Sequence, residues 1–181
     1  MDTAVEAGVA LPEDDPTRAL AVAHPDDPAL AHLAVVGDTY TVLFSGEQTA
    51  GRFAMLDMLI PPGGGPPPHR HDFEECFRVL EGSLEVHVRD LPPVRLEPGE
   101  SANIPANAPH MFRNAAEVPA RLICTVAPSG LEKYFAEFGD PVPSRTSPAP
   151  QLSDAEREER LARAIAKAPE YGMEILPRPE H

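Results

Sequence analysis

Short apolar and alternating segments recur along the chain from residue 33 onward. The first three are LAVV (33–36), DTYTVLFS (38–45) and RFAMLDMLI (52–60), and glycine-containing turns separate them. Further apolar runs cover 75–81 and 118–126, and the second of these contains the β-branched residues that favour strands. Strands of this length, repeating at intervals of roughly ten residues, are typical of a β-sandwich or β-barrel. The pattern therefore predicts an all-β core.

Residues 84–88 show the alternation of a half-buried strand. Apolar residues occupy every second position, and polar residues that include His87 occupy the positions between them. His87 is therefore expected to be solvated or to contact a neighbouring strand. Two short strands are predicted on either side of a Pro98-Gly99 turn, and another strand is predicted to begin near His110.

Helical periodicity replaces alternation after residue 128. Ser129 and Glu132 have the Ser-x-x-Glu spacing of a capping box, and Gly139 is a helix stop signal. Apolar and aromatic side chains recur at helical spacing between these signals and form a stripe along one face. This stripe is expected to pack on the β core, an arrangement that is compatible with closing the mouth of a barrel. Its members are Leu131, Tyr134, Phe135 and Phe138.

A second capping box, Ser153 to Glu156, predicts a charged helix that continues to Lys167. Its apolar side is thin, so this helix is expected to be weakly anchored. Residues 173–176, MEIL, are expected to add an edge strand or to wrap a neighbouring subunit.

These patterns divide the chain into four parts. The first is rich in proline and acidic residues without a sustained period, so it is expected to be a poorly structured acidic arm in which His24 and His32 are solvated. The predicted boundaries are 1–32 for the arm, 33–139 for the β-barrel with its flanking helix, 140–152 for a proline-rich linker, and 153–181 for a C-terminal helix and tail.

Composition and charge narrow the classes of partner. The 181 residues are 42% hydrophobic, which suffices for one compact domain. A formal charge of −14 disfavours nucleic acid and anionic membranes as partners. No run approaches the ~20 apolar residues of a spanning helix, and the N-terminus is acidic, so a cytoplasmic protein is expected. Cys76 and Cys124 lie in apolar strand-like runs and are expected to be buried, reduced thiols.

The chemistry is concentrated where a Gly/Pro loop gives way to an apolar run. His69 and His71 are separated by one residue there, and Glu75 follows four residues later. Successive side chains of a strand point to opposite faces, so the two imidazoles share a face while Arg70 points away. Two imidazoles and a carboxylate can therefore converge on one point.

Two spacings extend this pattern. The first is Gly63, five residues, His69, one residue, His71, three residues, Glu75, six residues, Gly82. The second is Gly99, five residues, Pro105, one residue, Asn107, two residues, His110, three residues, Asn114. Together they resemble the two motifs of the cupin superfamily, written G-x5-H-x-H-x3,4-E-x6-G and G-x5-P-x-G-x2-H-x3-N.

One position departs from these motifs, because Asn107 stands where the family has glycine. Asn is the non-glycine residue that best tolerates the positive φ of a tight turn, so the departure leaves the chemistry intact. The six-residue spacing to Gly82 selects Glu75 over Glu74 as the motif carboxylate, and alternation sends Glu74 to the opposite face.

The resemblance implies a small jelly-roll barrel with a metal site inside it. The implied ligands of one divalent ion are His69, His71, Glu75 and His110. Three neutral imidazoles and one carboxylate suit Fe, Mn, Ni, Co, Cu or Zn. In an octahedral site these four ligands would leave two positions for water, substrate or dioxygen, which favours catalysis over a purely structural ion.

Runs such as GDTYTVLFSGEQT and PEYGMEILP are similar to those of single-domain cupins of the bacterial quercetin 2,3-dioxygenase type. This resemblance implies a metal-dependent dioxygenase of an enol or flavonol-like small molecule, with Glu75 as a catalytic proton acceptor. A non-redox cyclase or isomerase and a non-catalytic small-molecule or metal-binding protein remain alternatives, because function lies in the pocket and not in the fold.

Alternation from the ligands also predicts which apolar side chains border the cavity. The candidates are Phe73, Phe77 and Phe112, with Phe53 and Met55 on a neighbouring strand as further candidates. A homodimer is expected, because the open edges of a jelly roll could be covered by the arm or the C-terminal segment of a partner.

Overall fold

The computed structural model describes residues 11–177. The strands are β1 (His32–Val35), β2 (Asp38–Phe44), β3 (Ala54–Ile60), β4 (His69–His71), β5 (Glu74–Glu81), β6 (Leu84–Val88), β7 (Val94–Leu96), β8 (Ser101–Ile104), β9 (His110–Arg113), β10 (Ala120–Ala127), β11 (Asp140–Pro141) and β12 (Met173–Ile175). The helices are α1 (Gly46–Thr49), α2 (Leu131–Phe138), α3 (Asp154–Lys167) and the 3-10 helix η1 (Ala168–Tyr171).

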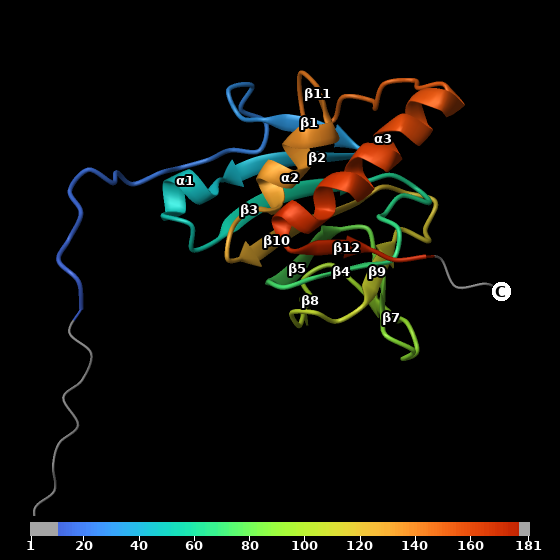
Figure 1. Ribbon diagram of the computed structural model, residues 1–181, viewed down its shortest axis with the longest axis horizontal. Helices are drawn as coiled ribbons and strands as arrows, with labels where there is room; N and C mark the ends of the chain where they lie inside the picture. The colour runs from blue at the N-terminus through green and yellow to red at the C-terminus, as the bar shows by residue number, and fades with distance from the viewer. Residues whose placement is uncertain (1–10, 178–181) are drawn as a thin grey trace, which may run out of the picture.

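The strands form two antiparallel sheets (Figure 1). Within residues 11–177, the larger sheet has the order β11-β1-β2-β3-β10-β5-β8 and the smaller has the order β12-β4-β9-β6-β7. Consecutive strands such as β4 and β5 lie in different sheets, so the chain crosses between the layers as it does in a jelly roll. The all-β jelly-roll prediction is confirmed.

Alternating burial along the strands builds the core between the sheets. In β5 and β10 every second residue is buried, and the residues between them are exposed or half-buried. Phe77, Leu56 and Leu122 are among the largest fully buried side chains. Each such burial stabilises the fold by roughly 1.5–3 kcal/mol, so the hydrophobic pattern fixes which face of each strand turns inward.

The Gly/Pro loop, residues 61–68, is tied to the end of β9. The Gly63 N–H donates to the carbonyl of Asn114 at 2.8 Å, and the Asn114 N–H donates to the carbonyl of Gly64 at 3.0 Å. Gly65 has φ +129°, and a Cβ there would clash with the carbonyl oxygen of Phe112. Asn107 has φ +65°, the positive value expected for its turn. These loops place the two histidine-bearing strands next to each other.

The C-terminal part of the chain returns to cover one end of the core (Figure 1). Tyr134 of α2 donates a hydrogen bond to the carbonyl of Ala164 in α3, at 3.0 Å. Strand β12 then pairs with β4 in register, Met173 with His71 and Ile175 with His69. The C-terminal segment is thus an edge strand of its own chain's sheet. We refer to α2, α3, η1 and β12 as the C-terminal cap.

Only one of the two predicted capping boxes forms. Ser153 and Glu156 cap α3 reciprocally, with the Ser153 N–H donating to Glu156 at 2.7 Å. The prediction for α2 is wrong, because Gly130 is its N-cap and Ser129 lies outside. Glu132 instead accepts hydrogen bonds from the backbone N–H groups of Gly130 and Gly46, each at 2.9 Å, and so joins α2 to α1.

Residues 11–31 are mostly exposed coil (Figure 1), and residues 1–10 of the predicted arm lie outside the described residues. His24 is exposed, as expected, but the prediction for His32 is wrong. His32 is buried at the start of β1, and its Nδ1 lies 2.7 Å from the Thr41 hydroxyl on β2. Pairing with β2 buries this position, and the proline-rich sequence before it gives no indication of that pairing.

Within residues 11–177, no helix combines the length and the apolar character that crossing a membrane requires.

Candidate metal centre

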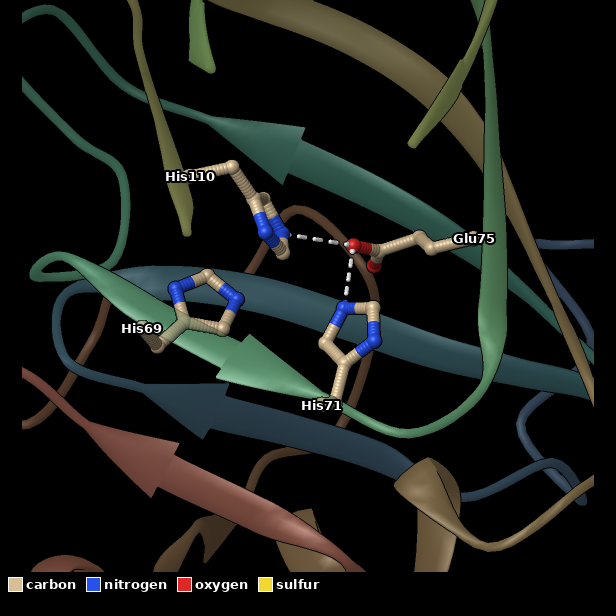
Figure 2. Close-up of side chains that lie close together, drawn as sticks. All are labelled: His69, His71, Glu75 and His110. Atoms are coloured by element: carbon tan, nitrogen blue, oxygen red, sulfur yellow. Dashed lines mark hydrogen bonds and ion pairs between the residues drawn. The ribbon is translucent and has the colours of Figure 1, made fainter. Parts of the chain in front are cut away.

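Four side chains converge between the two sheets (Figure 2). His69 and His71 lie on β4, His110 lies opposite His69 on β9, and Glu75 reaches across from β5 of the larger sheet. All four side chains are buried, and one ligand atom from each lies within 4.8 Å of the others. Motif residues from two distant stretches thus form one cluster.

Backbone carbonyls orient the three imidazoles. The Nδ1 atoms of His69, His71 and His110 each lie 2.9 Å from a carbonyl oxygen two residues away along the chain. Carbonyl oxygens only accept, so each Nδ1 carries the proton. In the neutral form of such a ring the Nε2 lone pair faces the cluster, which is the arrangement in which histidine binds metals.

The carboxylate of Glu75 faces these nitrogens. Its Oε2 lies 3.1 Å from His71 Nε2 and 3.2 Å from His110 Nε2. Burial raises the pKa of Glu75, but when His110 and His71 donate an Nε2–H to it these contacts outweigh burial and hold that pKa well below its usual range. Burial also lowers the pKa of His69, to about 4, so this ring is neutral. A metal ion that displaced these Nε2 protons would meet an ionised carboxylate and imidazole lone pairs.

This donor set fits a divalent transition-metal ion. Nitrogen lone pairs and a carboxylate oxygen at these separations repel one another unless positive charge lies among them. A divalent ion would supply that charge, and imidazole with carboxylate suits several first-row metals. His69, His71, Glu75 and His110 would hold it, so the cluster is suited to a metal ion whose identity the ligands leave open.

A small cavity of about 60 Å³ adjoins the cluster. His69, His71 and Glu75 form part of its lining, and the remainder is mostly apolar. The apolar wall comes from the two sheets, the cap and two loops. The larger sheet contributes Val35, Tyr40 and Met58, the smaller sheet Phe112, Met173 and Ile175, the helices of the cap Leu131, Tyr134, Phe135, Phe138, Leu161 and Ala164, and the loops Val36, Pro66 and Pro67.

Only Phe112 of the five predicted pocket residues belongs to this lining. Phe73 instead stacks flat on His71, with ring centroids 3.9 Å apart, and Phe77 packs edge-to-face on Phe112 at 5.2 Å, deeper in the core. Neither side chain is part of the cavity lining in this structure.

Phe53 and Met55 are absent from the lining of the cavity. Alternation in β3 buries the even-numbered positions, and Met58 is the one that reaches the lining. Met55 pairs with Thr125, whose other cross-strand neighbour is the exposed Cys76, so its side chain belongs to the outer face. Phe53 precedes β3 and bonds through its backbone to Thr49 of α1.

The sequence interpretation did not name Tyr40 or the side chains of the cap as lining residues of the cavity. The aromatic stripe on α2 was the available signal, because an apolar helix face packs against another part of the core. Tyr40 contacts Phe135 of that stripe, with ring centroids 4.8 Å apart, and donates a hydrogen bond to Asp38 at 3.0 Å. Burial raises the pKa of Asp38 to about 7, despite that hydrogen bond.

The two cysteines differ in their environments. Cys124 is buried and its thiol lies 3.2 Å from Glu75 Oε1, whereas Cys76 is exposed on the outer face of β5. Both are free thiols, as expected, but the expected burial of Cys76 is wrong. The strand alternates, so Cys76 must face outward once Glu75 and Phe77 face inward.

Comparisons with known proteins agree with the fold. Residues 56–126 match the family model described as Cupin domain. Protein SchB of Streptomyces halstedii is 31% identical over 97 residues, which make up 52% of this chain and 69% of that protein. The chain belongs to the cupin superfamily.

Two further relatives resemble this cupin. Quercetin 2,3-dioxygenase of Bacillus subtilis (strain 168) is 31% identical over 103 residues, 56% of this chain but only 30% of that protein, so the chain spans less than a third of that relative's length. The solved structure of the polyketide cyclase RemF from Streptomyces resistomycificus has a TM-score of 0.54 and 23% identity, covering 84% of this chain and 96% of RemF. At that identity RemF supports the fold alone.

Proposed function

We propose that this cupin is a metal-dependent dioxygenase of an enol or flavonol-like small molecule. The observation that carries the proposal is the position of a His₃Glu cluster at the edge of an apolar, aromatic cavity. The 31% identity with Quercetin 2,3-dioxygenase supports the reaction class. Both atoms of dioxygen would enter the product, so the reaction needs no external reductant.

The chain's own residues would bind the substrate and hold its proton. A divalent ion in the cluster would lower the pKa of a substrate hydroxyl by its charge. Glu75 lines the cavity and would accept that proton as the catalytic base on Oε2, the oxygen that faces the cluster. The aromatic side chains Phe112, Tyr134 and Phe135 would pack on the substrate ring and keep water away.

The size of the cavity indicates how a substrate would lie. At about 60 Å³ it is smaller than the ~300–1,000 Å³ of typical small-molecule sites. A second hollow of about 620 Å³ adjoins it, and Val36, Phe138 and Leu161 are part of the wall that the two share. We infer that the reacting enol enters the inner cavity when these side chains shift, while the remainder of the substrate occupies the outer hollow.

Oxygen uptake tests the proposal. Metal-free protein would be loaded separately with Mn²⁺, Fe²⁺, Co²⁺ or Ni²⁺ and mixed with quercetin or other enols in an oxygen-electrode cell. We expect uptake that depends on both metal and substrate and that is lost in the double variant His69→Ala with His71→Ala. The variant His87→Ala, on β6 outside the cluster, is the matched control and should retain uptake.

Two other outcomes would replace the dioxygenase assignment with one of the alternative functions. Conversion of a substrate under nitrogen, without oxygen uptake, would identify a non-redox cyclase or isomerase. Metal or ligand binding without turnover of any compound would leave a small-molecule or metal-binding cupin.

A further inference from the structure

The two carboxylate oxygens of Glu75 have different partners. Oε2 faces the imidazoles of His71 and His110, at 3.1 and 3.2 Å. Oε1 instead accepts the thiol proton of Cys124, whose Sγ lies 3.2 Å away. Both residues are buried, so water does not compete readily for either contact. One oxygen is thereby turned toward the ligand nitrogens and the other toward the sheet.

The sheet fixes the position of this thiol. Strand β10 pairs with β3 on one side and β5 on the other, and Cys124 lies opposite Phe77 while Val126 lies opposite Glu75. Residues two apart on a strand share a face, so Cys124 is a diagonal neighbour of Glu75 on the inner face. A central strand with partners on both sides holds its side chains more firmly than an edge strand or a loop.

We propose that Cys124 is a positioning residue of the metal centre, whose thiol holds Glu75 so that Oε2 alone is offered to a bound ion. The proposal rests on the metal-binding cluster and adds the coordination mode of its carboxylate. Within the described residues Cys124 is not itself part of the cluster of ligand atoms. Outer contacts of this kind orient metal ligands, and losing one typically costs about 10–100-fold in metal affinity.

A purely structural Cys124 would behave differently. A buried cysteine also acts as a small hydrophobic side chain, and in that role alanine or valine would replace it with only a packing cost. Serine would then be the poorest substitute, because it buries a hydroxyl group. For a positioning residue serine is the best substitute, because its hydroxyl donates to Oε1 in place of the thiol.

The experiment uses the full chain, stripped of metal with a chelator and titrated with Co²⁺ alone against a competing chelator dye. The variants are Cys124→Ala, Cys124→Val and Cys124→Ser. Cys76→Ala is the matched control, because Cys76 lies next to Glu75 in the sequence but points outward, 3.0 Å from Asn103. Valine preserves the core volume, so it provides the test if the alanine variant does not fold.

We expect Cys124→Ala and Cys124→Val to weaken Co²⁺ binding by about 10–100-fold. Their visible Co²⁺ spectra should also change, because a released carboxylate can bind through both oxygens and alter the coordination number. Cys124→Ser should restore affinity and spectrum to within a few-fold of the parent chain, and Cys76→Ala should leave both unchanged.

Several results would overturn the proposal. Unchanged affinity and spectrum in the alanine and valine variants would show that the thiol only fills space. An intense thiolate-to-cobalt band in the parent chain, lost in Cys124→Ser, would make Cys124 a ligand. Failure of the parent chain to bind Co²⁺ would overturn the metal centre itself, a result distinct from the first two.

Discussion

The His₃Glu cluster and the C-terminal cap lie against the same cavity, but their side chains are held in different ways. Each imidazole of the cluster is oriented by a backbone carbonyl, and Glu75 has a partner for each carboxylate oxygen. The cap meets the cavity through apolar and aromatic side chains, and Ala164 is the one residue of α3 that is buried. Hydrogen bonds orient the ligands, whereas the side chains of α2 and α3 that face the cavity make mainly apolar contacts, and the hydrogen bonds of the cap join its own elements to one another and to the sheets.

This difference separates two tasks. Directional hydrogen bonds preorganise the ligand atoms. Preorganised ligands lose little conformational entropy when they bind an ion. Apolar contacts lack fixed geometry, so the side chains of α2 and α3 that line the cavity can shift to admit a substrate at modest cost. We therefore expect changes in the cluster to affect metal binding and changes in the cap to affect stability and access.

The largest effect is expected from removing two ligands. The double variant His69→Ala with His71→Ala should lose metal affinity by more than the ~100-fold that outer contacts contribute, while the sheets still fold. Metal content after dialysis and the circular dichroism spectrum would measure the two properties. Full metal content in this variant would contradict the assignment of the cluster, and His87→Ala serves as the control.

A large effect confined to the cap is expected from Phe138→Ala. Phe138 is 7% exposed and packs edge-to-face on Tyr134 at 4.9 Å, so the change should cost about 3–5 kcal/mol. Hydrogen exchange should accelerate in α2, α3 and β12, with Co²⁺ affinity nearly unchanged. Leu161→Ala is the control, because Leu161 is 46% exposed and should have a much smaller effect. Equal acceleration in β5 and β10 would show that cap and sheets unfold as one unit.

A pH-dependent effect is expected from Asp38→Asn in β2, near the Gly/Pro loop. Burial raises the pKa of Asp38 from 3.8 to about 7, so the folded chain keeps a proton that the unfolded chain releases. The contribution of Asp38 to stability therefore falls as pH rises from about 4 to about 7, by on the order of 2–4 kcal/mol. Asparagine has no such titration, so the variant should gain stability relative to the parent chain across this window.

Urea unfolding at pH 4.5 and pH 8 would measure that gain. Asp154→Asn is the control, because the Asp154 side chain is 99% exposed, and it should show no comparable change between the two conditions. A stability difference between Asp38→Asn and the parent chain that is the same at both pH values would contradict the protonated, buried carboxyl group.

The smallest effect is expected from Tyr134→Phe. The change removes the hydrogen bond to the Ala164 carbonyl but keeps the aromatic ring, so it should cost about 1 kcal/mol. Thermal unfolding and hydrogen exchange of α3 would detect it, with Tyr171→Phe, which loses a partly buried bond to Glu137, as the comparison. A loss of metal affinity in Tyr134→Phe would contradict the expectation that changes in the cap leave metal binding unaffected.

Predictions that rested on local rules were confirmed most often. Period-two alternation located the strands and separated Glu75 from Glu74, which accepts hydrogen bonds from Asn103 and Ala106 on the outer face. Positive φ at Asn107 and the Ser153 capping box follow from the preferences of single residues. Homodimer formation, a matter of edges and partners, stays a prediction that light scattering would test.

The sequence by itself determined the strands, the shared face of His69 and His71, and the motif that adds His110. Only the tertiary structure decided that His32 is buried, that Phe73 supports a ligand ring, and that the cap closes the cavity. It also decided that Cys124 contacts Glu75. Alternation along a strand is a local rule that the sequence states directly, whereas these contacts join strands and helices far apart in the chain. Their register and packing follow from burying the whole core at once, which no single segment encodes.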